Sequence, residues 1–284
     1  MATSIFWGTN KVDTDANFRL WGKGVSDAMD AVGFTKTADT GQVDWALVAK
    51  PVGVNNYPGY EIRAFTDTIQ ASTPIIVKIE YGSGQYQGGV RVTVGRETDG
   101  AGNLIGETTS SMRCESPYSG TADSGSHPCI ICGGDGHIEV FLFIDAGSYN
   151  FAFWVSRVKD DEGADTDLGI DLGVQYQNSS FQVFFPKKGL QYPLAGTSAP
   201  TCLAPGVGPF SYAGNLGIFP VCTGLGYVAN PNLSALVWDG VSINSVGSVI
   251  TINVFGDPHD FMITTLATGT INGMSGCKLA VRYE

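Results

Sequence analysis

The sequence predicts a mainly β protein of antiparallel β-sandwich or jelly-roll-like lobes, with one N-terminal helix and long Gly/Pro/Ser-rich loops. Two observations predict this class, and a third concerns the surface. The 284 residues include 38 glycines, which suit tight turns between short strands. Beyond residue 33, apolar positions recur with the period of two that is typical of strands. Charged residues make up only 15% of the chain, which suits a surface partly covered by other subunits.

One segment near the start of the chain has the period of a helix. Within residues 15–33 the apolar side chains share one helical face: Trp21, Val25, Ala28 or Met29, and Val32. Gly33 is suited to end this helix. Because Gly22 and Gly24 weaken the first half, the firmest helical prediction covers residues 24–32.

Residues 60–106 predict a meander of antiparallel strands. Alternating apolar positions mark two of these strands: Ile75, Val77, Ile79 and Tyr81 in the first, and Val90, Val92 and Val94 in the second. Asp99-Gly100 and Gly102-Asn103 then mark turns. We expect the helix to pack on this sheet, and a short helix or turn near Phe65 to cover it as well. Gly41 and Gly59 are expected where turns need a permissive backbone.

The sequence divides into three regions: residues 1–106 as a lobe of helix and β-meander, residues 107–136 as a Cys/Gly/Ser-rich loop or linker, and residues 137–284 as a C-terminal β-sandwich lobe. In the last region, residues 137–158 predict two strands about an Asp-Ala-Gly-Ser turn. Further strands are predicted near residues 169–177, 180–186, 225–229, 235–238, 248–255, 260–267 and 278–283. Residues 187–220 predict a second irregular stretch.

A Cys-x-x-Cys pair raises the question of a metal site. Cys129 and Cys132, with His127 and His137 beside them, could supply zinc ligands. No second Cys-x-x-Cys follows, and the glycines after Cys132 oppose the helix of a thioredoxin-like redox centre. The favoured interpretation is a loop with free thiols or a late disulfide. The candidate disulfide partners are Cys114 with Cys129 or Cys132, and Cys202 with Cys222.

The sequence predicts no enzyme and no cofactor, and the zinc ion is the less favoured alternative. Neither a Gly-x-Ser-x-Gly nor a His-Glu-x-x-His motif occurs. Asp165, Asp167 and Asp171 only partly match a calcium loop, so a solvated acidic loop is favoured. His259, between Asp257 and Asp260, could belong to a catalytic dyad, but a turn between strands is favoured because no nucleophile with a positioned base is identifiable.

Charge and hydropathy narrow the classes of partner. The formal net charge is −11 and no basic run occurs, which argues against nucleic-acid binding. No apolar run approaches the roughly 20 residues that span a bilayer. The first residues lack the basic and apolar regions of a secretory signal. We therefore expect synthesis in a cytoplasm, with cysteines that are reduced at first.

Four motifs carry a resemblance to a known family. They are Trp-Gly-x-Gly-(Val/Ile)-Ser at residues 21–26, Thr-Gly-Gln-(Val/Ile)-(Asp/Asn)-Trp at 40–45, Gly-Tyr-Glu-Ile-(Trp/Arg)-x-Phe at 59–65 and Lys-Ile-Glu-Tyr-Gly at 78–82. With them, residues 6–106 resemble a family of tailed-bacteriophage virion proteins. The match is a pattern of packing residues and carries no active site.

The resemblance implies a virion protein assembled in the cytoplasm of a host bacterium as a homo-oligomer with other virion proteins. The tail, baseplate or fibre attachment is the favoured location, and a capsid decoration or head–tail accessory protein is the alternative. A second hypothesis is a receptor- or carbohydrate-binding module for a host surface glycan. Its expected signature is a set of exposed aromatic residues: Tyr57, Tyr60, Tyr86, Tyr118, Tyr192 and Tyr212.

Overall fold

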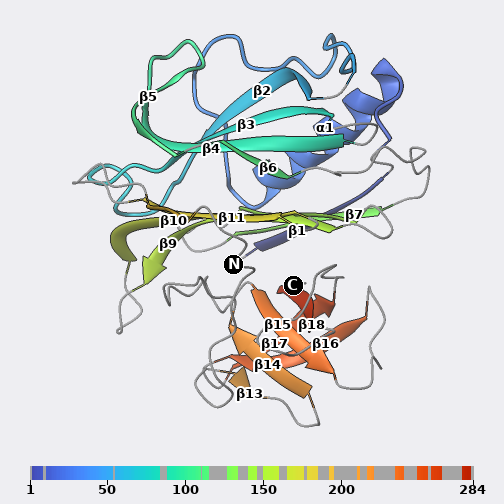
Figure 1. The fold of residues 1–284 in the computed structure, drawn as a ribbon, viewed down its shortest axis with the longest axis vertical. Helices are drawn as coiled ribbons and strands as arrows, with labels where there is room; N and C mark the ends of the chain where they lie inside the picture. The colour runs from blue at the N-terminus through green and yellow to red at the C-terminus, as the bar shows by residue number, and fades with distance from the viewer. Residues whose placement is uncertain are drawn as a thin grey trace.

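The structure, a computed structural model, is mainly β and antiparallel, which confirms the predicted fold class (Figure 1). It describes residues 2–8, 11–53, 55–83, 88–109, 111–114, 127–133, 140–145, 150–159, 165–175, 178–184, 192–194, 210–211, 216–220, 234–239, 248–254, 257–263 and 277–282. These residues form one helix and three antiparallel sheets. The one helix among the described residues is not long and apolar enough to cross a membrane.

A five-stranded sheet holds the predicted meander. Its strands follow in order β2 (Asn56–Ala64), β3 (Ile76–Ser83), β4 (Gly88–Thr98) and β5 (Leu104–Thr108), and β6 (Met112–Cys114) also pairs with β4. Ile79 lies opposite Val92 and Val77 opposite Val94, so the predicted apolar positions share one buried face. Phe65 is buried beside a turn at residues 67–73, as expected.

The helix α1 (Asp15–Ala31) has the predicted buried face, but it is longer than its firmest predicted part. Thr14 caps its first turn by accepting a hydrogen bond from the Asn17 N–H at 3.1 Å. After the helix, Gly33 adopts a φ of +85°, a conformation that favours glycine. Gly22 and Gly24 lie inside the helix, because tertiary contacts outweigh their low helix propensity.

Replacing Ala28 by aspartate is expected to lower the free energy of unfolding by more than about 3 kcal/mol, because it buries an unpaired carboxylate. Ala28 is only 4% exposed and belongs to the apolar core. The matched control is Ala16→Asp, on the exposed side of the same helix. Urea unfolding of both variants checks the assignment. An Ala28→Asp variant as stable as Ala16→Asp would contradict it.

A seven-stranded sheet joins the start of the chain to its middle. Its strands are ordered β1 (Ala2–Gly8), β7 (His127–Gly133), β8 (Val140–Asp145), β9 (Asn150–Lys159), β10 (Asp165–Gln175), β11 (Asn178–Phe184) and β12 (Tyr192–Leu194). Residues 107–136 are therefore not wholly a loop, since they include β6 and β7. Phe6 lies opposite Cys129, a pairing between distant segments that local periodicity cannot reveal.

A six-stranded sheet contains the C-terminal strands. In spatial order they are β13 (Phe210–Ser211), β16 (Val249–Val254), β17 (Asp257–Ile263), β18 (Cys277–Arg282), β15 (Ser234–Asp239) and β14 (Leu216–Pro220). Ile252, Phe261 and Ala280 belong to its own buried cluster. The predicted irregular stretch at residues 187–220 thus includes the short strands β12, β13 and β14. The strand predicted at 225–229 lies outside the described residues.

The main core gathers side chains from the helix and from two sheets. Trp21 and Met29 on α1 belong to the same buried cluster as Val92 on β4 and Val155 on β9. Strand β6 also contacts β9 and β10. The core of the lobe predicted at residues 1–106 therefore includes Val155, a residue of the predicted C-terminal lobe. The division of the chain into these three regions stays a prediction.

Candidate functional site: a buried charge network

Two oppositely charged side chains lie buried on β2, facing the helix. Glu61 and Arg63 are two residues apart, so they point to the same face of the sheet. The exposed fraction of each side chain is 0%. Glutamate and arginine are rarely buried to this degree unless they are paired. Their partners therefore decide what this site can do.

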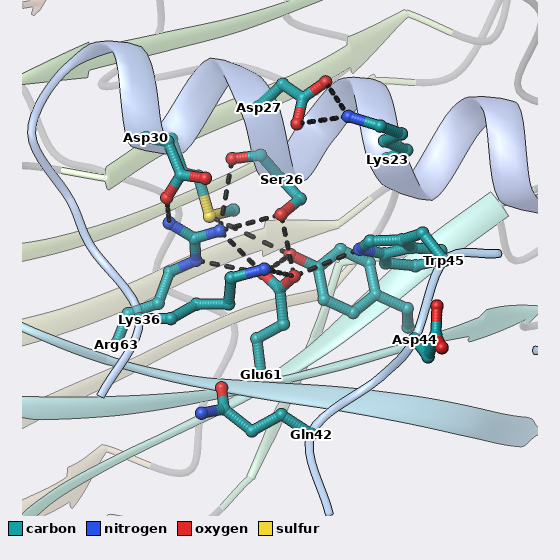
Figure 2. A network of polar contacts seen from close by, with 12 residues as sticks. Lys23, Ser26, Asp27, Asp30, Lys36, Gln42, Asp44, Trp45, Glu61 and Arg63 are labelled. Carbon is teal, nitrogen blue, oxygen red and sulfur yellow. Dashed lines mark hydrogen bonds and ion pairs between the residues drawn. The ribbon is translucent and has the colours of Figure 1, made fainter. Parts of the chain in front are cut away.

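Both carboxylate oxygens of Glu61 accept several hydrogen bonds (Figure 2). Oε1 accepts from the Ser26 hydroxyl at 2.7 Å, the Trp45 indole N–H at 3.1 Å and the Lys36 ammonium at 3.3 Å. Oε2 accepts from the Tyr81 hydroxyl at 2.8 Å, and from Nε and Nη2 of Arg63 at 3.0 and 2.8 Å. These bonds replace the water that the carboxylate loses on burial.

The guanidinium of Arg63 connects β2 to the second half of α1. Nη1 donates to Oδ1 of Asp30 at 2.8 Å and to the carbonyl oxygen of Phe34. Nη2 donates to the carbonyl and hydroxyl oxygens of Ser26 at 3.1 and 2.9 Å. Figure 2 shows Ser26 and Asp30 reaching down from the helix to this group. Arg63 thus holds the helix and the segment after it against the sheet.

The pKa of Glu61 is lowered by this environment. Burial alone would raise it, but the charge of Arg63 and the hydrogen bonds from Ser26 and Arg63 outweigh burial. Because the pKa is lower in the folded state, the ionised Glu61 stabilises the fold at pH values above its ordinary pKa of 4.5. This stabilisation is lost as the pH falls through the lower pKa of the folded state.

We therefore expect a pH-dependent difference in stability between the native chain and its Glu61→Gln variant. The difference should be full near pH 7 and should narrow as the pH falls below the ordinary value of 4.5, because glutamine does not titrate. Urea unfolding at several pH values measures it. A difference that stays constant down to acidic pH would contradict the ionised state assigned to Glu61.

A glycine in the helix makes room for the indole in this network. A Cβ atom on Gly22 would lie 2.0 Å from Cη2 of Trp45, closer than any real contact. The Trp45 ring also meets Phe18 and Tyr81 edge to face, with centroid distances of 5.7 and 4.9 Å.

Gly59 likewise leaves room for a neighbouring side chain. It lies inside β2 and not in the predicted turn, and a Cβ atom there would lie 2.6 Å from Val43. Gly41, with a φ of +77°, fits the predicted turn.

Replacing Gly22 by alanine is expected to destabilise the protein by about 2 kcal/mol, although alanine normally favours a helix interior. The added methyl group must displace Trp45 and break its hydrogen bond to Glu61. In a Trp45→Leu background the same change should cost less or become stabilising, because the large ring is gone. Thermal unfolding of the four proteins of this cycle checks the contact. Equal effects in both backgrounds would contradict it.

The four sequence motifs meet at this network. The motif at residues 21–26 contributes Ser26, and its Gly22 leaves space for the Trp45 ring. The motif at 40–45 contributes Trp45 itself. The motif at 59–65 contributes Glu61 and Arg63, and the motif at 78–82 contributes Tyr81. Both oxygens of the carboxylate are already engaged and buried. The network is therefore suited to fix the helix on the sheet and not to abstract a proton from a substrate.

A second buried ion pair joins two sheets. Arg157 on β9 donates through Nε to Asp67 Oδ2 at 2.5 Å and through Nη2 to Asp67 Oδ1 at 3.1 Å. The exposed fractions of the two side chains are 0% and 1%. The guanidinium also donates to Oε1 of Gln70 at 3.0 Å and lies 5.6 Å from the ring centroid of Phe65. This pair ties the turn between β2 and β3 to the seven-stranded sheet.

The predicted zinc ligands lie on an extended segment where the structure describes them. His127, Cys129 and Cys132 belong to β7, so about 10 Å separates the two cysteine Cα atoms. A Cys-x-x-Cys half-site instead needs a chain that turns to bring both sulfurs to one ion. His137, Cys202 and Cys222 lie outside the described residues, and Cys114 ends β6. Zinc and the disulfides stay predictions.

The other predicted candidates fall on strands as well. Asp165, Asp167 and Asp171 belong to β10, and His259 with both neighbouring aspartates belongs to β17, where a turn was favoured. Asp260 accepts a hydrogen bond from the Thr251 hydroxyl at 2.7 Å. Within the part of the chain that the structure describes, no group of three or more His, Cys, Asp or Glu side chains is placed to hold a metal.

Two of the predicted surface tyrosines rest against cations. The ring centroid of Tyr57 lies 4.7 Å from the Arg91 guanidinium, and that of Tyr60 lies 4.6 Å from the Lys78 ammonium. Both tyrosines are half-buried. Tyr192 lies on β12, and the other three tyrosines are outside the described residues: Tyr86, Tyr118 and Tyr212.

Sequence reasoning did not identify the two buried ion pairs. The available signal for the first was a pair of charges at alternate positions in a strand pattern, Glu61 and Arg63, on the face that the helix covers. Comparison with protein-family models, characterised proteins and solved structures finds no match to this chain. A function for this chain must therefore be inferred from its residues and their geometry.

Proposed function

We propose that this chain is a structural component of a tailed-phage virion that acts through subunit interfaces. The observation that carries the proposal is the convergence of the four motifs on the Glu61–Arg63 network. The segments that resemble the virion proteins are those that build one rigid helix-on-sheet unit. A resemblance confined to such residues is expected of a protein whose task is to present a surface.

Composition supports the same proposal. A chain with 15% charged residues has a surface rich in small polar and apolar groups, as found where subunits cover one another. We place the protein in the tail, the baseplate or the fibre attachment, as a homo-oligomer with other virion proteins. It would be assembled in the host cytoplasm without a catalytic site. Capsid decoration and a head–tail accessory role are the alternatives within this class.

A gold-tagged antibody against the chain, applied to purified particles of the phage that encodes it, tests the location by electron microscopy. Gold at the tail or its tip is the expected result. Gold spread over the capsid would overturn the tail assignment in favour of decoration. Particles that lack the labelled tail structure provide a control, because the gold label should be absent from them.

A second candidate function is a receptor- or carbohydrate-binding module. The specific observation in its favour is the pair of tyrosines, Tyr57 and Tyr60, that lie with cations on one sheet. Aromatic rings with polar side chains around them are common in sites that bind sugars. This function is compatible with a place in the tail, where host contact occurs, and the two candidates can be tested separately.

A further inference from the structure

The two most exposed large apolar side chains of the described residues lie on one short loop. In the connection between α1 and β2, residues 46–53 include Leu47, which is 75% exposed, and Val52, which is 81% exposed. Ala46 and Ala49 beside them are exposed as well. Single exposed apolar side chains are ordinary on a protein surface, but several of them on one loop mark a site of contact.

The same loop also has an inward side that anchors it to the protein. Val48 packs against the main core, and Pro51 is buried. Trp45, directly before the loop, packs against the same core. The loop therefore has its own places in the core, and it presents Leu47 and Val52 to solvent from an anchored position.

Hydrogen bonds to the helix fix the backbone of this loop. Arg19 on α1 donates through Nε to the carbonyl oxygen of Val48 at 2.7 Å and through Nη2 to that of Leu47 at 3.0 Å. Oδ1 of Asp15 accepts from the Lys50 N–H at 2.9 Å. A loop that is already fixed loses little conformational entropy when a partner packs on it, which favours binding.

The charges beside the loop balance one another. Residues 11–27 contain three cations and three anions, and residues 44–53 contain one of each, so these stretches have no net formal charge. The whole chain, in contrast, has a net charge of −11. Lys23 and Asp27, 2.5 Å apart, pair within the chain. Two copies of an acidic chain repel each other least where their local charge is zero.

We propose that residues 46–53, here termed the apolar loop, dock against the same loop of a second copy of this chain, in a two-fold contact centred on Leu47 and Val52. A two-fold contact brings the same surface against itself, so that surface must be complementary to itself. An apolar surface with balanced charges meets this condition. Burial of the apolar side chains supplies the favourable free energy. The inference deepens the proposed homo-oligomeric virion component and rests on it.

Other kinds of occupant fit the apolar loop less well. Sugars stack on aromatic rings, whereas the exposed apolar side chains of this loop are aliphatic. An anionic lipid surface attracts clusters of lysine and arginine, which the balanced charges beside the loop do not form. A different virion protein is the alternative that the experiment separates from a second copy.

Sedimentation equilibrium of the full-length protein over a range of concentrations tests the proposal. The native chain is expected to dimerise, and Val52→Asp should weaken dimerisation at least about tenfold, because a carboxylate would be buried against apolar groups. Leu47→Ser should weaken it as well. Val249→Asp is the matched control, since Val249 is also exposed but lies on β16 in another sheet, and this variant should dimerise like the native chain. Matching circular dichroism spectra would show that all variants fold.

The salt dependence of dimerisation distinguishes an apolar contact from an ionic one. Because salt screens the repulsion between two acidic copies, dimerisation of the native chain is expected to strengthen as the salt concentration rises. Weakening by salt would overturn the proposal, since it would indicate ion pairs between the copies.

Three other results would overturn the proposal. The first is a native chain that stays monomeric at every concentration, and the second is a Val52→Asp variant that dimerises as tightly as Val249→Asp. The third is a monomeric native chain whose Val52→Asp variant is lost from phage particles, which would assign the apolar loop to a different virion protein. Failure of the proposed function has a separate signature, because the native chain itself would then be absent from purified particles.

Discussion

Replacing Glu61 by glutamine is expected to lower the free energy of unfolding by about 3 kcal/mol at neutral pH. The change leaves the buried guanidinium of Arg63 with Asp30 as its remaining carboxylate partner, and Asp30 is 44% exposed. It also weakens the bonds from Ser26, Trp45 and Tyr81 to the lost charge. Urea unfolding followed by tryptophan fluorescence measures the effect.

Two further variants make this prediction specific. Asp27→Asn breaks the exposed Lys23–Asp27 pair on α1 and should change stability by less than about 0.5 kcal/mol. The double variant Glu61→Leu with Arg63→Met removes both buried charges and should be more stable than Glu61→Gln, because no unpaired charge remains. A Glu61→Gln variant as stable as Asp27→Asn would contradict the role assigned to the network.

Replacing Arg157 by methionine is expected to cost about 3–5 kcal/mol, since it leaves the Asp67 carboxylate buried without its partner. The exposed fraction of that carboxylate side chain is 1%. Because the pair links β9 to the turn after β2, hydrogen exchange should also speed up in residues 67–73. Equilibrium unfolding and amide exchange measure the two effects.

A double-mutant cycle separates the ion pair from simple loss of packing. Asp67→Asn combined with Arg157→Met should cost clearly less than the sum of the two single changes, because each single change strands one buried group. Additive costs would mean that the two side chains act independently. In that case the contact between the two sheets would depend on the apolar core alone.

The features that were predicted correctly from the sequence are those that depend on residues close together in the chain. The buried face of α1 and the order of the meander follow from periodicity, because neighbouring residues decide both. The pairing of β1 with β7 could not be predicted, since it joins segments more than a hundred residues apart. Helix α1 covers most of the predicted segment 15–33, but the reason for Gly22 within it could not be predicted, because Trp45, which requires the space, lies outside the helix.

The candidate site was predictable only in part. The motifs containing Ser26, Trp45, Glu61 and Tyr81 were visible as a resemblance, yet nothing in their spacing shows that they meet around one carboxylate. Nothing in the sequence indicated the role of Arg157, because its partner Asp67 lies ninety residues earlier, in the turn between β2 and β3.

The buried network and the ion pair between sheets give the proposed function its physical basis. A subunit that is held by interfaces must present the same surface in every copy, so its internal elements need a fixed arrangement. Glu61, Arg63 and Arg157 provide this by hydrogen bonds of defined direction, in addition to the non-directional burial of apolar groups.

The most direct test of the proposed virion role is quantitative mass spectrometry of density-purified particles of the phage proposed to encode the chain. After dissolution, the chain is expected at a fixed copy number relative to the major capsid protein, unchanged by high-salt washing. Absence of the chain from particles, with its peptides readily detected in infected cells, would contradict a structural role in the virion.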